Sequence, residues 1–107
     1  MSTTTATDAT FEAEVIASGL PTVVDFSTDW CPPCRRLSPI VEELSAEYAG
    51  RVRFVKVDGD TSPEVTAKYG VRGFPTLLVF DKGQVAQRIA GFRPKSDLVR
   101  QINAVVG

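Results

Sequence analysis

Two cysteines separated by two prolines stand where an apolar segment gives way to an amphipathic one. Residues 21–28, PTVVDFST, form a mostly apolar run that is typical of a buried strand. Residues 33–48 place aliphatic and tyrosine side chains at helical spacing, with charged side chains between them. The segment 31–34, CPPC, therefore lies between a strand and a helix. This order limits the fold to one in which a strand leads directly into a helix, and it puts both thiols at that junction.

Strand and helix patterns alternate along most of the chain. Besides the segments around the cysteines, we expect helices near residues 8–18, 62–69 and 95–106, and strands at 51–58, 74–81 and 84–90. Asp8 or Thr10 is the expected cap of the first helix. Strands separated by helices are expected to run parallel, whereas the two-residue connection at 82–83 predicts an antiparallel hairpin. The predicted fold class is therefore α/β, with a central mixed sheet flanked by helices on both faces.

The length of 107 residues suits one hydrophobic core, so we expect a single domain over residues 1–107. Residues 1–7 are rich in serine and threonine and are expected to be loosely ordered, with an edge strand at 3–6 as the alternative. The formal charge of -1 gives no bulk attraction to nucleic acid or to an anionic membrane. We therefore expect neither as a partner, and we expect a monomer.

The amino-terminal sequence bears on location. The first ten residues, MSTTTATDAT, have neither a basic flank nor an apolar stretch, so they do not resemble a secretory signal. No apolar run approaches the ~18 residues of a membrane span. Two cysteines are also too few for the disulfide framework of a small secreted domain. These features favour a cytoplasmic protein, although an exported protein whose signal had been removed would have the same pattern.

Four roles are open to the two cysteines. A structural zinc site needs four ligands, and this chain has two cysteines and no histidine, so only a dimer sharing the metal would complete the set. A structural disulfide that closes two intervening residues would restrict the unfolded chain very little. Two ordinary buried cysteines are the third possibility. A redox pair that opens and closes is the fourth.

The redox pair has a positive physical argument. Cys31 lies at the amino terminus of the predicted helix, where unpaired backbone N–H groups and the helix dipole favour a thiolate over a thiol. Arg35 and Arg36 add positive charge nearby. Cys34 follows one helical turn later on the same face. This spacing predicts that Cys31 attacks a disulfide and that Cys34 resolves the mixed disulfide.

Three blocks of the sequence resemble the thioredoxin family. They are DFSTDWCPPC at 25–34, KYGVRGFPTLLVF at 68–80 and KGQVAQRIAG at 82–91, and the resemblance runs from Phe11 to the carboxyl terminus without a large insertion. It implies the thioredoxin fold and a redox-active disulfide, with no cofactor and no metal bound to the chain. The implied activity is that of a thiol–disulfide oxidoreductase that reduces protein disulfides.

The resemblance also implies roles for single residues. Cys31 matches the attacking cysteine, Cys34 the resolving one, and Trp30 the tryptophan beside them. Asp25 matches a buried aspartate that helps to move the proton of the resolving cysteine, and Lys56 matches a lysine that approaches it. The residues themselves agree, because Asp25 interrupts an otherwise apolar strand and its burial should raise its pKa.

A second set of residues is implied to bind substrate. Pro75 matches a proline that faces the cysteines, which implies a cis bond between Phe74 and Pro75. In the family, backbone before this proline pairs with an extended substrate segment, and Gly73 and Gly91 would leave room for it. The side chains of Trp30, Val71 and Phe74 are expected to form an exposed apolar rim.

The sequence departs from the family pattern at three places. Phe74 precedes Pro75 where the family usually has Ile, Val or Thr, which predicts a larger contact surface. Ser27 stands where a bulky residue is common, which predicts looser packing beneath the active-site loop. The spacer is Pro32-Pro33 instead of Gly-Pro, so we expect the helix to begin at Pro33 and a stiffer site with a shifted redox potential. Neither proline has an N–H, which leaves Cys34 and Arg35 as the nearest backbone donors to the Cys31 sulfur.

The sequence as a whole predicts a general protein-disulfide reductase. By resemblance, a flavin-dependent thioredoxin reductase that draws on NADPH would regenerate it, and proteins containing disulfides would be its substrates. Two other functions stay open. The unusual spacer is compatible with a disulfide oxidase or isomerase, and the fold is compatible with a protein-binding module whose redox chemistry is incidental.

Overall fold

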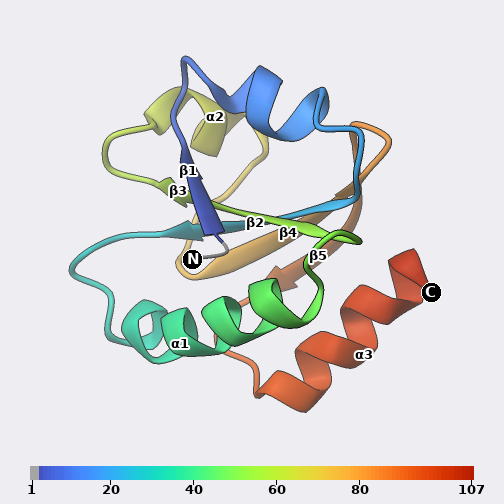
Figure 1. The fold of residues 1–107 in the computed structure, drawn as a ribbon. Helices are drawn as coiled ribbons and strands as arrows, with labels where there is room; N and C mark the ends of the chain where they lie inside the picture. Colours follow the sequence, from blue (N-terminus) through green and yellow to red (C-terminus); the bar gives the residue numbers. More distant parts are fainter. Residues whose placement is uncertain (1–2) are drawn as a thin grey trace.

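The computed structural model describes residues 3–107, which form one five-stranded sheet covered by helices on both faces (Figure 1). In chain order the elements are β1 (Thr3–Ala6), a π-helical turn η1 (Glu12–Ile16), β2 (Thr22–Ser27), α1 (Pro32–Glu47), β3 (Arg53–Asp58), α2 (Pro63–Lys68), β4 (Thr76–Asp81), β5 (Gln84–Ala90) and α3 (Lys95–Val106). No helix of the described residues is long and apolar enough to cross a membrane.

The sheet has the strand order β1-β3-β2-β4-β5 and is mixed. β3 pairs in parallel with β1 and with β2, whereas β4 pairs antiparallel with β2 and with β5. The predicted α/β fold class is therefore confirmed, including the antiparallel hairpin at the end of the sheet. β2 is the central strand, so the segment that leads into the cysteines is held from both sides.

The amino-terminal strand corrects one expectation. Residues 1–7 were expected to be loosely ordered, yet Thr3–Ala6 forms β1 and pairs with β3 from Phe54 to Val57. Threonine favours extended backbone, and the free edge of β3 supplies hydrogen-bonding partners. Ala6 is buried at this edge. The prediction of looseness is wrong for residues 3–6, and residues 1–2 lie outside the described part of the chain.

Each face of the sheet carries its own hydrophobic cluster. α1 and α3 cover one face, whereas η1 and α2 cover the other (Figure 1). Side chains alternate along β2, so Val23 packs in the cluster beneath α1 and Val24 packs in the opposite cluster. By the same alternation Asp25 points toward α1. The sheet therefore buries this carboxyl group on the side of the helix that carries the cysteines.

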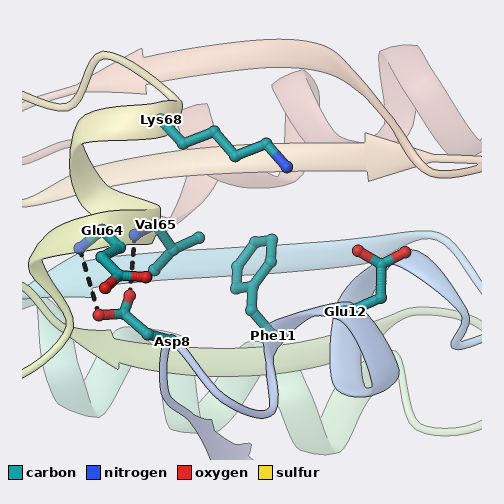
Figure 2. Close-up of a pocket in the computed structure, with 6 residues that line it drawn as sticks. All are labelled: Asp8, Phe11, Glu12, Glu64, Val65 and Lys68. Carbon is teal, nitrogen blue, oxygen red and sulfur yellow. Dashed lines mark hydrogen bonds between the residues drawn. The ribbon is translucent and has the colours of Figure 1, made fainter.

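Asp8 has a different role from the one expected. It does not cap the turn that follows it; its carboxylate accepts hydrogen bonds from the backbone N–H groups of Glu64, at 3.2 Å, and of Val65, at 2.8 Å. Figure 2 shows these bonds beside Phe11, which lines the same hollow. Ser62, at the N-cap of α2, makes no side-chain capping bond. Asp8 therefore caps α2 from a segment 56 residues away.

Asp8→Ala is expected to lower the free energy of unfolding by about 1 kcal/mol, because two N–H groups of α2 lose their acceptor. Urea unfolding followed by circular dichroism measures the change. Asp8→Asn is the intermediate variant, since its amide oxygen can accept from only one of the two N–H groups, and we expect part of the stability to remain. Equal stability of Asp8→Ala and the wild type would show that the cap contributes nothing.

Candidate functional site

The two cysteines lie where β2 leads into α1, as the sequence predicts. Cys31 is the N-cap of α1, in extended conformation, and Cys34 lies in the first turn. A disulfide joins their sulfur atoms, with the Cα atoms 5.2 Å apart. The N–H of Cys34 points at Cys31 Sγ, 3.2 Å away. Both residues are buried, at 3% and 5% exposure, so a partner can reach this pair only through a small opening.

The helix begins one residue earlier than expected, at Pro32 instead of Pro33. Both prolines lie in the first turn, where N–H groups have no acceptor within the helix, so their missing donors cost no helical hydrogen bond. Of the two backbone N–H groups expected near the Cys31 sulfur, those of Cys34 and Arg35, only the first is directed at it. Cys34 N–H does point at the sulfur, but Arg35 N–H donates to the Cys31 carbonyl oxygen at 3.2 Å. One backbone donor, that of Cys34, is therefore directed at the sulfur.

The backbone before Pro75 lies directly against the disulfide. The bond between Phe74 and Pro75 is cis, which confirms the expectation from the family resemblance. The carbonyl oxygen of Phe74 is 3.5 Å from Cys31 Sγ. Gly91 N–H donates to the Pro75 carbonyl oxygen at 2.8 Å, which fixes this loop to the end of β5. Gly73, Phe74, Pro75 and Gly91 together line a surface hollow of about 400 Å³.

Of the three side chains expected on an exposed apolar rim, Trp30 is exposed, Phe74 is half-buried and Val71 is buried. Trp30 is 64% exposed, and its ring meets that of Phe74 edge-on with centroids 6.2 Å apart. Val71 is only 7% exposed and packs in the hydrophobic cluster beneath α2, so its expected place on an exposed rim is wrong. Phe92 is exposed instead, and the Arg36 guanidinium lies 5.5 Å from the centre of its ring. An aromatic residue directly after Gly91 was the signal for it.

A hydrogen bond that local patterns do not predict orients Trp30. Its indole Nε1 donates to Asp60 Oδ2 at 2.8 Å. Asp60 lies in the loop after β3, 30 residues away along the chain, and comes close only because β3 pairs with β2. An indole N–H has a single donor, so this bond sets which edge of the ring faces the loop. Trp30 is therefore an exposed aromatic side chain with a fixed orientation.

Asp25 is a buried carboxyl group on the central strand β2. It is 2% exposed, and its Oδ1 has no hydrogen-bond partner within the described residues. Burial raises the pKa of Asp25 from its ordinary 3.8 to about 6, and the positive charge of Lys56 opposes part of that rise. Lys56 is the register partner of Asp25 on β3. The predicted rise of the Asp25 pKa is confirmed.

Lys56 lies beside a hollow that reaches Cys34. Its Nζ donates to Ser38 Oγ of α1 at 3.0 Å. The hollow measures about 190 Å³ and is also lined by Ser27 and Cys34. Ser27 stands where the family commonly has a bulky side chain, and its small side chain leaves this space unfilled. The expected gap in packing beneath the active-site loop is therefore present, and it gives solvent a route toward Cys34.

Together these groups can perform thiol–disulfide exchange. The site holds two sulfur atoms at a helix amino terminus, a backbone N–H aimed at one of them and a buried acid that titrates near neutral pH. In the disulfide form the sulfur atoms are bonded to each other and are not free metal ligands. Within residues 3–107, no group of three or more His, Cys, Asp or Glu side chains is arranged to hold a metal ion.

Comparison with known proteins gives a consistent result. Residues 2–104 match the family model described as Thioredoxin. Thioredoxin of Pyropia yezoensis is 42% identical over 106 residues, which is 99% of each chain. Thioredoxin 1 of Synechococcus elongatus is 42% identical over 97 residues, or 91% of each chain. Thioredoxin of Rickettsia bellii is 42% identical over 97 residues, covering 91% of this chain and 92% of the other.

Proposed function

The chain belongs to the thioredoxin family and is a thiol–disulfide oxidoreductase, and from this premise we propose that it reduces protein disulfides through Cys31 and Cys34. The observation that carries the proposal is the Cys31–Cys34 disulfide at the start of α1, with the Phe74 carbonyl beside it. Residues 1–107 act in this proposal as one thioredoxin domain with a CPPC active site.

The reaction consists of two exchanges. In the reduced protein, the Cys31 thiolate attacks one sulfur of a substrate disulfide, and the other substrate sulfur leaves as a thiolate. The Cys34 thiolate then attacks Cys31 Sγ of the mixed disulfide. This second attack forms the Cys31–Cys34 disulfide and releases the remaining substrate thiolate. Two electrons pass from the protein to the substrate, and the two substrate thiolates take up protons from solvent or from nearby acids.

The N–H of Cys34 favours the charged form of Cys31. It lies 3.2 Å from Cys31 Sγ in the oxidised protein, and it adds to the field of the helix amino terminus. A thiolate that is stabilised in this way is available to attack near neutral pH. Pro32 and Pro33 contribute no N–H, but they hold Cys31 and Cys34 at opposite ends of a rigid first turn.

Asp25 accepts the proton of Cys34 during the second exchange. Its carboxylate oxygen Oδ1 has no partner within the described residues, and its pKa of about 6 leaves it mostly charged at neutral pH. The hollow lined by Ser27, Cys34 and Lys56 has room for water beside Cys34, and Lys56 is the register partner of Asp25, so a water molecule there can relay the proton toward the carboxylate. The positive charge of the Lys56 ammonium group stabilises the charged form of Asp25 and so lowers its pKa in part.

Substrate binds as an extended segment beside Pro75. The backbone at Phe74 pairs with it, whereas the Gly73 carbonyl oxygen already accepts a hydrogen bond from Thr76 Oγ1 at 2.7 Å, and the hollow next to Gly91 receives the substrate side chains. Trp30 and Phe74 offer an aromatic surface for apolar residues of the substrate. Their edge-on contact and the bond from Trp30 to Asp60 keep this surface in place before substrate arrives.

A flavoprotein thioredoxin reductase regenerates the dithiol with electrons from NADPH. A reductase of this kind works where thiols are kept reduced, so the proposal includes a cytoplasmic location. It acts as a monomer, because the reductase and the substrate must each reach the same buried disulfide.

A coupled assay tests this function. With thioredoxin reductase, NADPH and a disulfide-bonded protein substrate, we expect one NADPH to be oxidised for each disulfide reduced, as measured by absorbance and thiol titration. Protein reduced beforehand with dithiothreitol provides the second arm. If only the prereduced protein reduces substrate, the proposed route of regeneration is wrong; if neither does, the reductase function is wrong.

A further inference from the structure

The charged side chains that line the hollow beside Pro75 are all positive. Its lining residues are Gly70, Arg72, Gly73, Phe74, Pro75, Thr76, Arg88, Ala90 and Gly91. Two of them are arginines and none is an aspartate or a glutamate. The chain as a whole has a formal charge of -1, so this local excess of positive charge does not follow from composition.

The two arginines come from different elements and flank the substrate-binding backbone. Arg72 lies in the loop just before Gly73, whereas Arg88 lies on β5, opposite Leu78 of β4. Both are exposed, and neither has an ion-pair partner within residues 3–107. A guanidinium without a carboxylate partner keeps its capacity for a two-pronged bond to one.

Arg88 is held in place before any ligand binds. Its Nη2 donates to the backbone carbonyl oxygen of Tyr69 at 2.5 Å. This bond uses one of the five N–H donors of the guanidinium and leaves the others available. A charged group that is already oriented loses less conformational freedom on binding. Arg88 is therefore the better ordered of the two charges.

Carboxylates are found near Trp30, but together with a cation. Asp60 accepts the indole hydrogen bond of Trp30, and a second hollow is lined by Asp29 and Asp58 and also by Lys56. The charged lining of the hollow beside Pro75 is therefore entirely positive, whereas the second hollow carries both signs. A carboxylate is thus favoured at the hollow beside Pro75.

We infer that Arg72 and Arg88 form a subsite for a carboxylate side chain of the protein substrate, close in sequence to the disulfide that is reduced. The occupant is thus an acidic segment of a disulfide-containing protein, chosen by charge complementarity. This inference rests on the proposed reductase function and deepens it, because it specifies which disulfides are reduced fastest. Selection acts through local charge at the hollow, not through net charge.

Matched peptides test the subsite. A peptide disulfide is prepared in three forms with glutamate, glutamine or lysine next to one cysteine, and kcat/KM for its reduction is measured at low salt. We expect the order glutamate, glutamine, lysine, with the glutamate peptide reduced about three- to tenfold faster than the glutamine peptide. Raising the ionic strength should shrink this ratio, since exposed charges are screened within about 10 Å at 0.1 M salt.

Variants of the arginines locate the effect. The double variant Arg72→Gln/Arg88→Gln should bring the glutamate-to-glutamine ratio close to one, and Arg72→Gln alone should lower it partly. The single variant matters because the Arg72 side chain makes no hydrogen bond within residues 3–107 and is exposed, so its replacement leaves packing intact. Arg100→Gln is the control; it removes one exposed arginine on α3 and should preserve the ratio.

Two readouts separate the possible failures. Binding of the same peptides with serine in place of both cysteines is followed by the fluorescence of Trp30, the single tryptophan of the chain. Equal rates and equal binding for all three peptides would overturn the subsite and leave the reductase function standing. Preferred binding of the glutamate peptide without reduction of any disulfide form would support the subsite and overturn the reductase function.

Discussion

Cys31→Ser is expected to abolish the reduction of protein disulfides. A serine hydroxyl stays protonated near neutral pH, even at a helix amino terminus, so no attacking anion forms. Turnover in the reductase-coupled assay should fall to the rate seen without the protein. The comparison must be made with reduced wild-type protein, which also lacks the disulfide, so that lost chemistry is not confused with lost stability.

Cys34→Ser is expected to fail differently. Cys31 still attacks the substrate, but no second thiol displaces it, so the mixed disulfide accumulates. Non-reducing electrophoresis and mass spectrometry should show one substrate joined to Cys31, released by dithiothreitol. The double variant with both cysteines replaced should form no such species. A binding module with incidental chemistry predicts the reverse, namely unchanged function in each variant, and that result would exclude the enzymatic role.

The features that the sequence predicted are those determined by neighbours along the chain. Apolar periodicity placed β2 and α1, and the junction between them placed Cys31 and Cys34. Asp25 was identified because it interrupts an apolar strand, and a central strand is buried on both faces. Desolvation of a carboxyl group raises its pKa, and at Asp25 this effect outweighs the opposing charge of Lys56, so the direction expected from the buried position holds.

The features that the sequence did not predict depend on which segments the fold brings together. Thr3–Ala6 is mostly polar, so the sequence offered an edge strand only as the alternative to a loose terminus, and the free edge of β3 decides between the two. Val71 follows a helix and precedes an exposed loop, so its burial depends on the packing of α2 against the sheet. Asp8 caps a distant helix, and Arg72 meets Arg88 across a hollow, through pairings that no local pattern encodes.

Asp25 is expected to make the stability of the oxidised protein fall as pH rises. Its pKa is raised in the folded state, so between 3.8 and about 6 the folded protein binds more protons than the unfolded chain. The contribution of Asp25 to stability is therefore most favourable below pH 3.8 and declines as the pH rises toward 6. Above pH 6 its destabilising effect is constant. A rise from 3.8 to about 6 corresponds to about 3 kcal/mol against the charged form.

Asp25→Asn removes both the destabilising charge and the proton acceptor. The variant should therefore be more stable than the wild type, and it should resolve the mixed disulfide more slowly. Its advantage in unfolding free energy over the wild type should grow by about 3 kcal/mol as pH rises from 3.8 to above 6, measured by denaturant unfolding at each pH. Glu12→Gln, which removes an exposed carboxylate, should show no such trend.

The same Asp25→Asn variant also separates the structural role of Asp25 from its chemical one. Because Cys34 loses its proton acceptor, resolution of the mixed disulfide should slow, and the rate change that accompanies ionisation near pH 6 should disappear from its pH profile. A gain in stability with an unchanged resolution rate would leave Asp25 as a buried charge that destabilises the fold without moving the proton. A flat stability difference across this range would mean that burial does not shift its ionisation. Only the joint result, greater stability with slower resolution, supports Asp25 as the proton acceptor of Cys34.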